Sequence, residues 1–143
     1  MPDERAQVIA RIFDELINRG ELGSLEELVH PDYVDHGPFG DSHGYEGFRD
    51  LLGMFRGAFP DMTVRPVDIV QDGDRAAWRI EGFGTHQGDL PGIPATGKRV
   101  TFTGVEMGRL SEDGRAIEHW SGFDMLSILQ QLGVVPPLGA PVA

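Results

Sequence analysis

The residues best suited to chemistry lie together in the last folded segment of the chain, GRAIEHWSGFD, which runs from Gly114 to Asp124. This β-like run ends where a helix is expected to begin, so its last side chains could point into a cavity. A carboxyl among apolar side chains can hold or release a proton near neutrality, because desolvation disfavours its charged form. Imidazole titrates near neutral pH and could orient or share that proton. Asp124 and His119 are therefore our candidate catalytic residues.

Both candidates also have structural interpretations. An aspartate directly before the apolar run MLSIL is an ordinary helix N-cap, and a histidine on a sheet can be half-buried and hydrogen-bonded for structure alone. Alternation places His119 and Ser121 on one face of the last strand, whereas Asp124 falls on the Trp120 face if the strand runs straight. The two candidates therefore meet only if a bulge at Gly122 or the turn into the helix re-aims one of them.

Six further residues are expected at the pocket or its rim, where they would contact a ligand: His36, Trp78, His86, Phe102, Glu106 and Trp120. The aromatic members could stack on a planar ligand or belong to the core. His36 follows Asp35 in an irregular segment, and loops on a rigid scaffold often carry function; a turn-stabilising aspartate beside a surface histidine is the alternative. No histidine pair shows a compact ligand spacing such as H-x-x-x-H, so no metal site is expected.

The elements that must position these residues follow from hydrophobic periodicity. Asp3 is a plausible N-cap for the first helix, and Pro31 ends the second. Helices are predicted over 3–19, from 24 to 31, over 45–59 and from about 124, with an irregular segment at 31–44 and a long loop at 87–98. Strands are predicted over 62–70, 75–86, 99–110 and 116–123. Four successive strands indicate a meandering antiparallel sheet, and helices before strands indicate an α+β domain with a pocket between sheet and helices.

Composition narrows the classes of partner. A length of 143 residues suits a single domain with a loosely ordered or docked tail at 136–143, since single domains commonly span roughly 100 to 200 residues. The net charge of −11 disfavours nucleic acid and favours a neutral, largely apolar ligand. The chain has no cysteine, and we see neither a signal peptide nor an apolar run long enough for a membrane span, so we expect a soluble, cytoplasmic protein.

Several short motifs occur in order from about residue 5 to residue 136: YVDHGP at 33–38, FPDM at 59–62, GDRAAWR at 73–79, GTHQG at 84–88, GIPATGK at 92–98 and GRAIEHW at 114–120. Together they resemble the SnoaL-like polyketide cyclase family, within the NTF2-like and ketosteroid-isomerase-like superfamily. The resemblance implies a cone-shaped α+β barrel with a deep pocket, assembled as dimers or tetramers. It also implies that an aspartate ending the last strand, here Asp124, is the acid/base for aldol closure of an aromatic polyketide ester, without metal or organic cofactor.

The family does not fix the reaction, because its members include cyclases and cofactor-free hydroxylases. Our leading hypothesis is a polyketide cyclase-like enzyme acting on a hydrophobic carbonyl compound. The alternatives are a small-molecule-binding module without catalysis, and an isomerase, hydrolase or hydroxylase on the same scaffold. A carboxylate buried in the cavity would favour catalysis, whereas an Asp124 that only caps backbone amides would favour the binding module.

Overall fold

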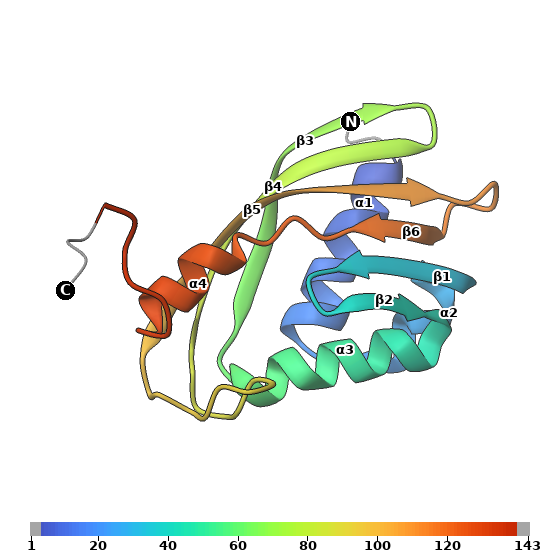
Figure 1. Cartoon of the computed structure of the whole chain (residues 1–143). Coiled ribbons are helices and arrows are strands. Elements are labelled where there is room, and N and C mark those ends of the chain that lie inside the picture. The colour runs from blue at the N-terminus through green and yellow to red at the C-terminus, as the bar shows by residue number, and fades with distance from the viewer. Residues whose placement is uncertain (1–3, 140–143) are drawn as a thin grey trace.

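A six-stranded sheet and the helices packed against it make up the computed structural model, which describes residues 4–139 (Figure 1). The helices come mostly first, as α1 (Glu4–Arg11), η1 (Ile12–Asn18), η2 (Leu22–Ser24), α2 (Leu25–Leu28) and α3 (Gly44–Ala58). The strands are β1 (Val29–Gly37), β2 (Gly40–His43), β3 (Thr63–Asp72), β4 (Arg75–Thr85), β5 (Arg99–Leu110) and β6 (Ala116–Trp120), and α4 (Met125–Gln131) ends the fold. The α+β prediction is confirmed.

The first helix changes geometry half-way. α1 is followed without interruption by η1, which is a π-helix, and the apolar stripe of the two buries Ile9, Phe13 and Leu16. Gly20 then adopts a φ of 66°, a left-handed conformation that favours glycine, and the helix ends. The predicted helix is confirmed, although its proposed cap Asp3 lies outside the described residues, as do residues 140–143 of the predicted tail. π-Helices are rare and occur frequently at functional sites.

Strands β1 and β2 correct two expectations. The segment 31–44, expected to be irregular, instead forms most of β1 and all of β2, which pair antiparallel around the turn at Pro38 and Phe39. The strand order is β2-β1-β6-β5-β4-β3, and β1 pairs with β6 in parallel, so the sheet is not a pure antiparallel meander. Pro31 lies where the β1–β6 register shifts, between Val29 and Val34, so the residue that lacks an N–H sits at an irregularity of the ladder. The turn-forming residues of this segment do not indicate β1, because its partner β6 lies far along the chain.

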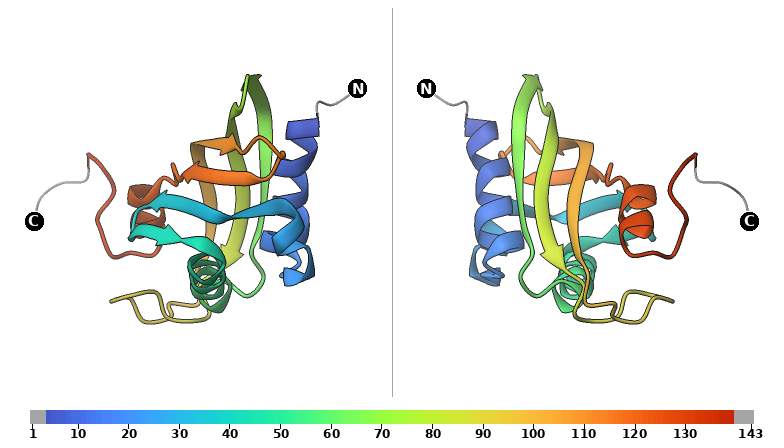
Figure 2. Two further views of the ribbon diagram at one scale, coloured as in Figure 1. Left: turned by 90° about the vertical axis from the view of Figure 1, so that its right-hand side faces the viewer. Right: turned by 90° about the vertical axis from the view of Figure 1, so that its left-hand side faces the viewer.

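The sheet is strongly curved and open. The half of the sheet formed by β3, β4 and β5 bends away from the half formed by β2, β1 and β6 (Figures 1 and 2). In the view of Figure 1, α1 lies behind the sheet and α3 runs below β2. One buried cluster joins η1 to β3, β4 and β5 around Phe59, Trp78 and Phe102. A second joins η1, α2 and α3 to β1 around Leu25, Tyr33 and Phe48. Packing between these layers leaves a cavity on the concave side, as the sequence predicted. No described helix is long and apolar enough to cross a membrane.

Candidate functional site

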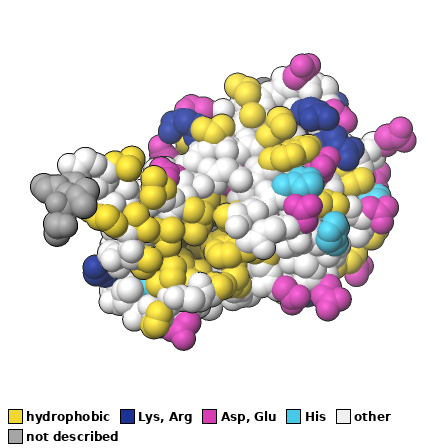
Figure 3. Space-filling view, viewed as in Figure 1, with side chains coloured by type: hydrophobic (Ala, Val, Ile, Leu, Met, Phe, Trp, Pro, Cys, Tyr) yellow, Lys and Arg dark blue, Asp and Glu magenta, His cyan; other side chains and the backbone are white. Residues whose placement is uncertain are grey.

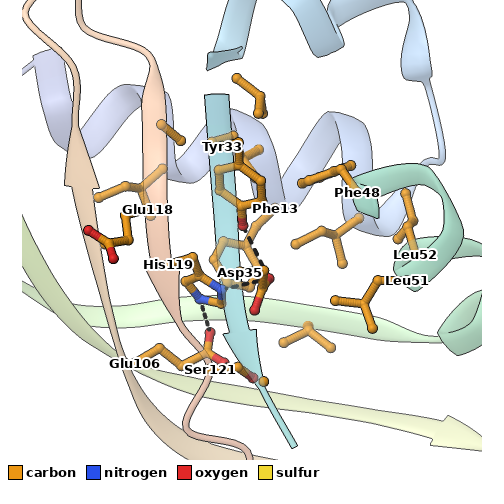
Figure 4. A pocket seen from close by; sticks show the side chains of 18 of the residues that line it. Phe13, Tyr33, Asp35, Phe48, Leu51, Leu52, Glu106, Glu118, His119 and Ser121 are labelled. Atoms are coloured by element: carbon orange, nitrogen blue, oxygen red, sulfur yellow. Dashed lines mark hydrogen bonds and ion pairs between the residues drawn. The ribbon is translucent and has the colours of Figure 1, made fainter. Parts of the chain in front are cut away.

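The cavity is apolar on most of its wall. Its lining comes from η1, α3 and the concave face of the sheet, and includes Phe13, Phe48, Leu51, Leu52 and Phe55 (Figure 4). Hydrophobic side chains also gather on the molecular surface between α4 and the turn that joins β1 to β2, where Phe39 and Leu126 are exposed (Figure 3). Such a wall suits a hydrophobic ligand, and polar groups on it would fix the ligand's orientation.

The polar groups of the cavity come from neighbouring strands in register. Alternation along β1 turns Tyr33, Asp35 and Gly37 towards the cavity, and Asp35 pairs directly with His119 on β6. Ser121 continues β6 by donating its backbone N–H to the carbonyl of His36, over 2.9 Å. On the next strands Glu106 of β5 lies opposite Trp78 of β4. The parallel β1–β6 pairing therefore brings together two polar residues that are 84 positions apart.

His119 lies between two carboxylates. Its Nδ1 is 3.0 Å from Asp35 Oδ2, and its Nε2 is 3.3 Å from Glu106 Oε1 (Figure 4). The hydroxyl of Tyr33 donates to Asp35 Oδ2 over 3.2 Å, and the hydroxyl of Ser121 donates to Glu106 Oε2 over 3.3 Å. Asp35 is 7% exposed and Glu106 3% exposed, whereas the side chain of His119 is 19% exposed, so the two carboxylates are almost closed to solvent and the imidazole is partly buried.

Burial and the carboxylates act on His119 in opposite directions. Desolvation alone lowers the pKa of the imidazole, but the hydrogen bonds to Asp35 and Glu106 and the charges of both carboxylates outweigh it and raise the pKa to about 10. Burial and the neighbouring Asp35 also raise the pKa of Tyr33 well above its usual value, so its phenol stays protonated and donates. His119 is thus an imidazolium at neutral pH, with both ring nitrogens donating.

Trp78 covers one face of this imidazolium. The two rings are stacked with centroids 5.8 Å apart and an interplanar angle of 10°, and Phe13 makes a T-shaped contact with Trp78. Gly108 makes this placement possible, since a Cβ at that position would lie 2.9 Å from the Trp78 ring. The stack and the two carboxylates fix the imidazole plane.

One oxygen of the network has no partner. Asp35 Oδ1 is buried and makes no hydrogen bond to any described residue, whereas Oδ2 receives the bonds from Tyr33 and His119. A buried carboxylate oxygen without a donor costs free energy unless a ligand or water supplies one. Asp35 Oδ1 is therefore the buried acceptor of this site that no described donor satisfies.

Three of the predicted site residues meet in the cavity: His119, Trp78 and Glu106. Asp124 is not among the lining residues; it is exposed and caps α4, with Oδ1 accepting from the backbone N–H of Ser127 over 3.0 Å. The N-cap interpretation of Asp124 is confirmed, and the expectation that it opens into the cavity is wrong. Strand alternation predicts that Asp124 and His119 point to different faces, and the structure agrees. The chain turns into α4 without bringing the Asp124 carboxylate back to the concave face.

The other four predicted contacts lie outside the cavity. His36 and Trp120 stack on each other on the opposite face of β1 and β6. His86 is fully buried near Phe59 and bonds to Thr96, holding the loop at 87–98. Phe102 packs in the core, against Phe59 and Phe123. In the structure these four side chains contribute to packing and to anchoring the loop, and a role for them in binding stays a prediction.

Three residues of the site were not among the predicted site residues. In the sequence Asp35 stands beside His36 as a candidate on a functional loop, with turn stabilisation as the alternative, and neither Tyr33 nor Ser121 is predicted. The available signal was alternation: Tyr33, Asp35 and Gly37 share one face if the segment is a strand. Among residues 4–139 no group of three or more histidine, cysteine or carboxylate side chains could hold a metal ion. Cofactor-free chemistry stays a prediction.

Comparison with known proteins gives one consistent family. The family model described as SnoaL-like polyketide cyclase matches residues 7–132. Nogalonic acid methyl ester cyclase of Streptomyces nogalater is 29% identical to this chain over 119 residues, which cover 81% of this chain and 88% of that protein.

Two solved structures extend the comparison. IdmH of Streptomyces antibioticus, named as a proposed polyketide cyclase, is 38% identical with a TM-score of 0.78, and the match covers 92% of this chain and all of that chain. AclR of Streptomyces galilaeus, named as a proposed hydroxylase, is 30% identical with a TM-score of 0.79, covering 94% of this chain and 84% of that chain. Similar scaffolds thus carry names from two reaction classes.

Proposed function

Because the chain belongs to the SnoaL-like polyketide cyclase family, we propose that it catalyses a cofactor-free, intramolecular aldol-type ring closure, with Asp35 rather than Asp124 as the acid/base. The observation that carries this proposal is the buried Asp35 carboxylate, which has one free oxygen in an apolar cavity and its other oxygen fixed by Tyr33 and His119. A base held in one orientation at a hydrophobic ligand is what proton abstraction requires.

The reaction needs a single proton shuttle. Asp35 Oδ1 takes a proton from a carbon flanked by carbonyl groups, and the C–H electron pair moves into the enolate. The enolate carbon attacks a second carbonyl of the same molecule, forming one C–C bond while the carbonyl π electrons pass to its oxygen. The resulting alkoxide takes the proton back from Asp35. No atom is lost, and the enzyme returns to its starting state.

The residues around Asp35 hold its charge and its geometry. The His119 imidazolium donates to Oδ2 from the side, and Glu106 keeps His119 protonated from its other nitrogen. An anionic ligand group would lie beside two carboxyl side chains in a cavity of low polarity, which supports a neutral substrate.

The names of the relatives support the same substrate class. The curated relatives are named as cyclases of nogalonic and aklanonic acid methyl esters. We propose a neutral, hydrophobic polyketide ester of this kind as the substrate of the present chain. The similarity to AclR keeps a hydroxylase as the second candidate, since its name assigns that chemistry to a similar scaffold.

Asparagine variants of the two aspartates test the assignment. Asp35→Asn keeps the shape of the site and removes the base, and it should lower turnover of an aromatic polyketide methyl ester by about 100-fold or more. Asp124→Asn is the matched control: asparagine is an equally good N-cap, so turnover and stability should stay close to wild type. Unchanged turnover in Asp35→Asn would contradict the proposal, and loss of turnover in Asp124→Asn alone would restore the family position.

Two further expectations stay predictions. Assembly as a dimer or tetramer follows from the family resemblance, and sedimentation would measure it. Location in the cytoplasm rests on the absence of cysteine from the sequence.

A further inference from the structure

The end of β1 holds a small recess beside the free oxygen of Asp35. Asp35 and Gly37 share the face of β1 that lines the cavity, and Ser121 lies next to them on the continuation of β6. A Cβ placed on Gly37 would be 3.5 Å from Asp35 Oδ1 and 3.8 Å from Ser121 Cβ. The missing side chain of Gly37 therefore leaves room about the size of one methyl group beside the buried oxygen Asp35 Oδ1.

Backbone conformation does not demand glycine at this position. The φ angle of Gly37 is outside the left-handed region in which ten other glycines of the described chain lie. All contacts of the hypothetical Cβ are ordinary van der Waals distances, so alanine would fit the strand without displacing its neighbours. Glycine at position 37 therefore leaves room beside Asp35, and it is not needed to avoid backbone strain.

The chemistry of the recess defines what can occupy it. Asp35 Oδ1 can accept a hydrogen bond, and the low polarity of the cavity wall disfavours an anion beside a carboxyl side chain. The occupant must therefore be a neutral donor attached to a hydrophobic body, and a phenolic or enolic hydroxyl on a planar ring meets both conditions. The side chain of Ser121, whose own hydroxyl donates to Glu106, bounds the recess on the other side.

We infer that Gly37 is a specificity-determining residue: it keeps open a subsite, bounded by Asp35 Oδ1 and Ser121, that binds the neutral phenolic or enolic hydroxyl of a planar ligand. The inference shares Asp35 with the proposed function, because an acidic enol or carbon acid must reach the same oxygen. It adds a recognition rule that holds for binding alone, whether or not the bound molecule is then turned over.

Paired naphthalene probes test this rule without a known substrate. 2-Naphthol and 2-methylnaphthalene have the same outline, but only the first donates a hydrogen bond. Without recognition, the cost of desolvating the hydroxyl makes 2-methylnaphthalene the tighter ligand. The wild-type protein should instead prefer 2-naphthol in a fluorescence or calorimetric titration. Equal affinities, or a preference for 2-methylnaphthalene, would overturn the inference.

Gly37→Ala should reduce the preference for 2-naphthol about tenfold, the loss expected for one hydrogen bond to a charged acceptor. Its affinity for 2-methylnaphthalene should change little. Gly53→Ala is the matched control, because Gly53 is exposed on α3 with no atom within 4 Å of its hypothetical Cβ. A Gly37→Ala protein with an undiminished preference would contradict the role of Gly37.

A ligand-side experiment gives the same information if Gly37→Ala does not fold. In 1,3-dimethyl-2-naphthol two methyl groups flank the hydroxyl and need the space that Gly37 leaves. Wild-type protein should bind this compound at least about tenfold more weakly than 2-naphthol, although it is the more hydrophobic of the two. Tighter binding would overturn the inference. Neither titration depends on turnover, so failure of the proposed reaction and failure of this subsite are separate results.

Discussion

Strands β1 and β6 carry a histidine between two carboxylates on each of their two faces. On the concave face His119 bonds to Asp35 and Glu106 and stacks on Trp78. On the convex face His36 bonds to Asp41 over 3.0 Å and Glu118 over 2.8 Å, and stacks on Trp120 at 5.5 Å. The two clusters use the same residue types and differ in what surrounds them.

Burial separates the clusters in function. The carboxylates of the concave cluster are almost fully enclosed, and Asp35 Oδ1 lacks a partner there, whereas the side chains of His36 and Asp41 are 33% and 53% exposed and water can satisfy them. Charge interactions are weakly screened inside a protein and strongly screened at its surface. Residue types alone therefore do not distinguish a functional site from a surface cluster. What distinguishes the concave cluster is a buried carboxylate oxygen without a hydrogen-bond donor and a cavity beside it.

The largest difference is expected when the two tryptophans are removed in turn. Trp78→Ala should lower the free energy of unfolding by about 3–5 kcal/mol, since it empties a buried position next to Phe13 and His119. Trp120→Ala removes a half-buried ring that stacks on His36 and lies near Arg75, and should cost clearly less. Urea unfolding of both variants measures this, and equal losses would mean that the two faces are equally packed.

Replacing the histidines compares the clusters in catalysis. His119→Asn keeps a donor towards Asp35 but removes the positive charge, and turnover should fall by about 100-fold. His36→Asn changes a surface group on the other face, so kcat should stay within about twofold of wild type, as for surface changes that leave the site intact. A similar loss in both variants would remove the functional distinction between the faces.

Much of the fold could be predicted from the sequence, and the exceptions share a cause. Helices and the strands β3 to β6 follow from local periodicity and turn residues, which is why their bounds agree with the prediction to within a few residues. β1 was not recognised, because Pro31 and the Gly37-Pro38 pair signal turns in isolation. Its strand conformation depends on β2 and, above all, on β6, and no local pattern reveals a partner that begins near residue 116.

The sequence also predicts only part of the site, because one of its strands, β1, is not recognisable from local patterns. His119, Trp78 and Glu106 lie on recognised strands, so expecting them at the pocket needed only alternation and packing. Expecting Asp35 at the pocket requires knowing that 29–37 forms the strand β1, which local patterns do not show. Asp124 was favoured because its N-cap geometry and a catalytic role are compatible in sequence, and only the path of the chain into α4 separates them.

The pH dependence of stability should belong to the concave cluster. The folded-state pKa of His119 is about 10, against 6.5 for an ordinary histidine, so its stabilising contribution is complete below pH 6.5 and is lost as the pH rises towards 10. In that window the free energy of unfolding should fall by up to about 1.4 kcal/mol per pH unit. His119→Asn should abolish most of this slope, and His36→Asn should preserve it; parallel curves for wild type and His119→Asn would contradict the assignment. The pKa of His36 is also raised, by Glu118 and Asp41, but solvent weakens the effect.

The smallest effect is expected at Glu118 on the convex face, and its response to salt sharpens the comparison. Glu118 also borders the cavity, but its carboxylate bonds to His36 and Arg109, and its side chain is 23% exposed. Glu118→Gln should lower the free energy of unfolding by less than about 1 kcal/mol, and the difference should shrink in 1 M salt, where the screening length is about 3 Å. Glu106→Gln is the enclosed counterpart: it leaves the His119 imidazolium with one carboxylate, and its larger cost should persist in salt because ions do not reach the cavity wall. If salt reduced both losses alike, the Glu106 side of the cavity would be open to solvent, and enclosure could not be what gives this cluster its chemistry.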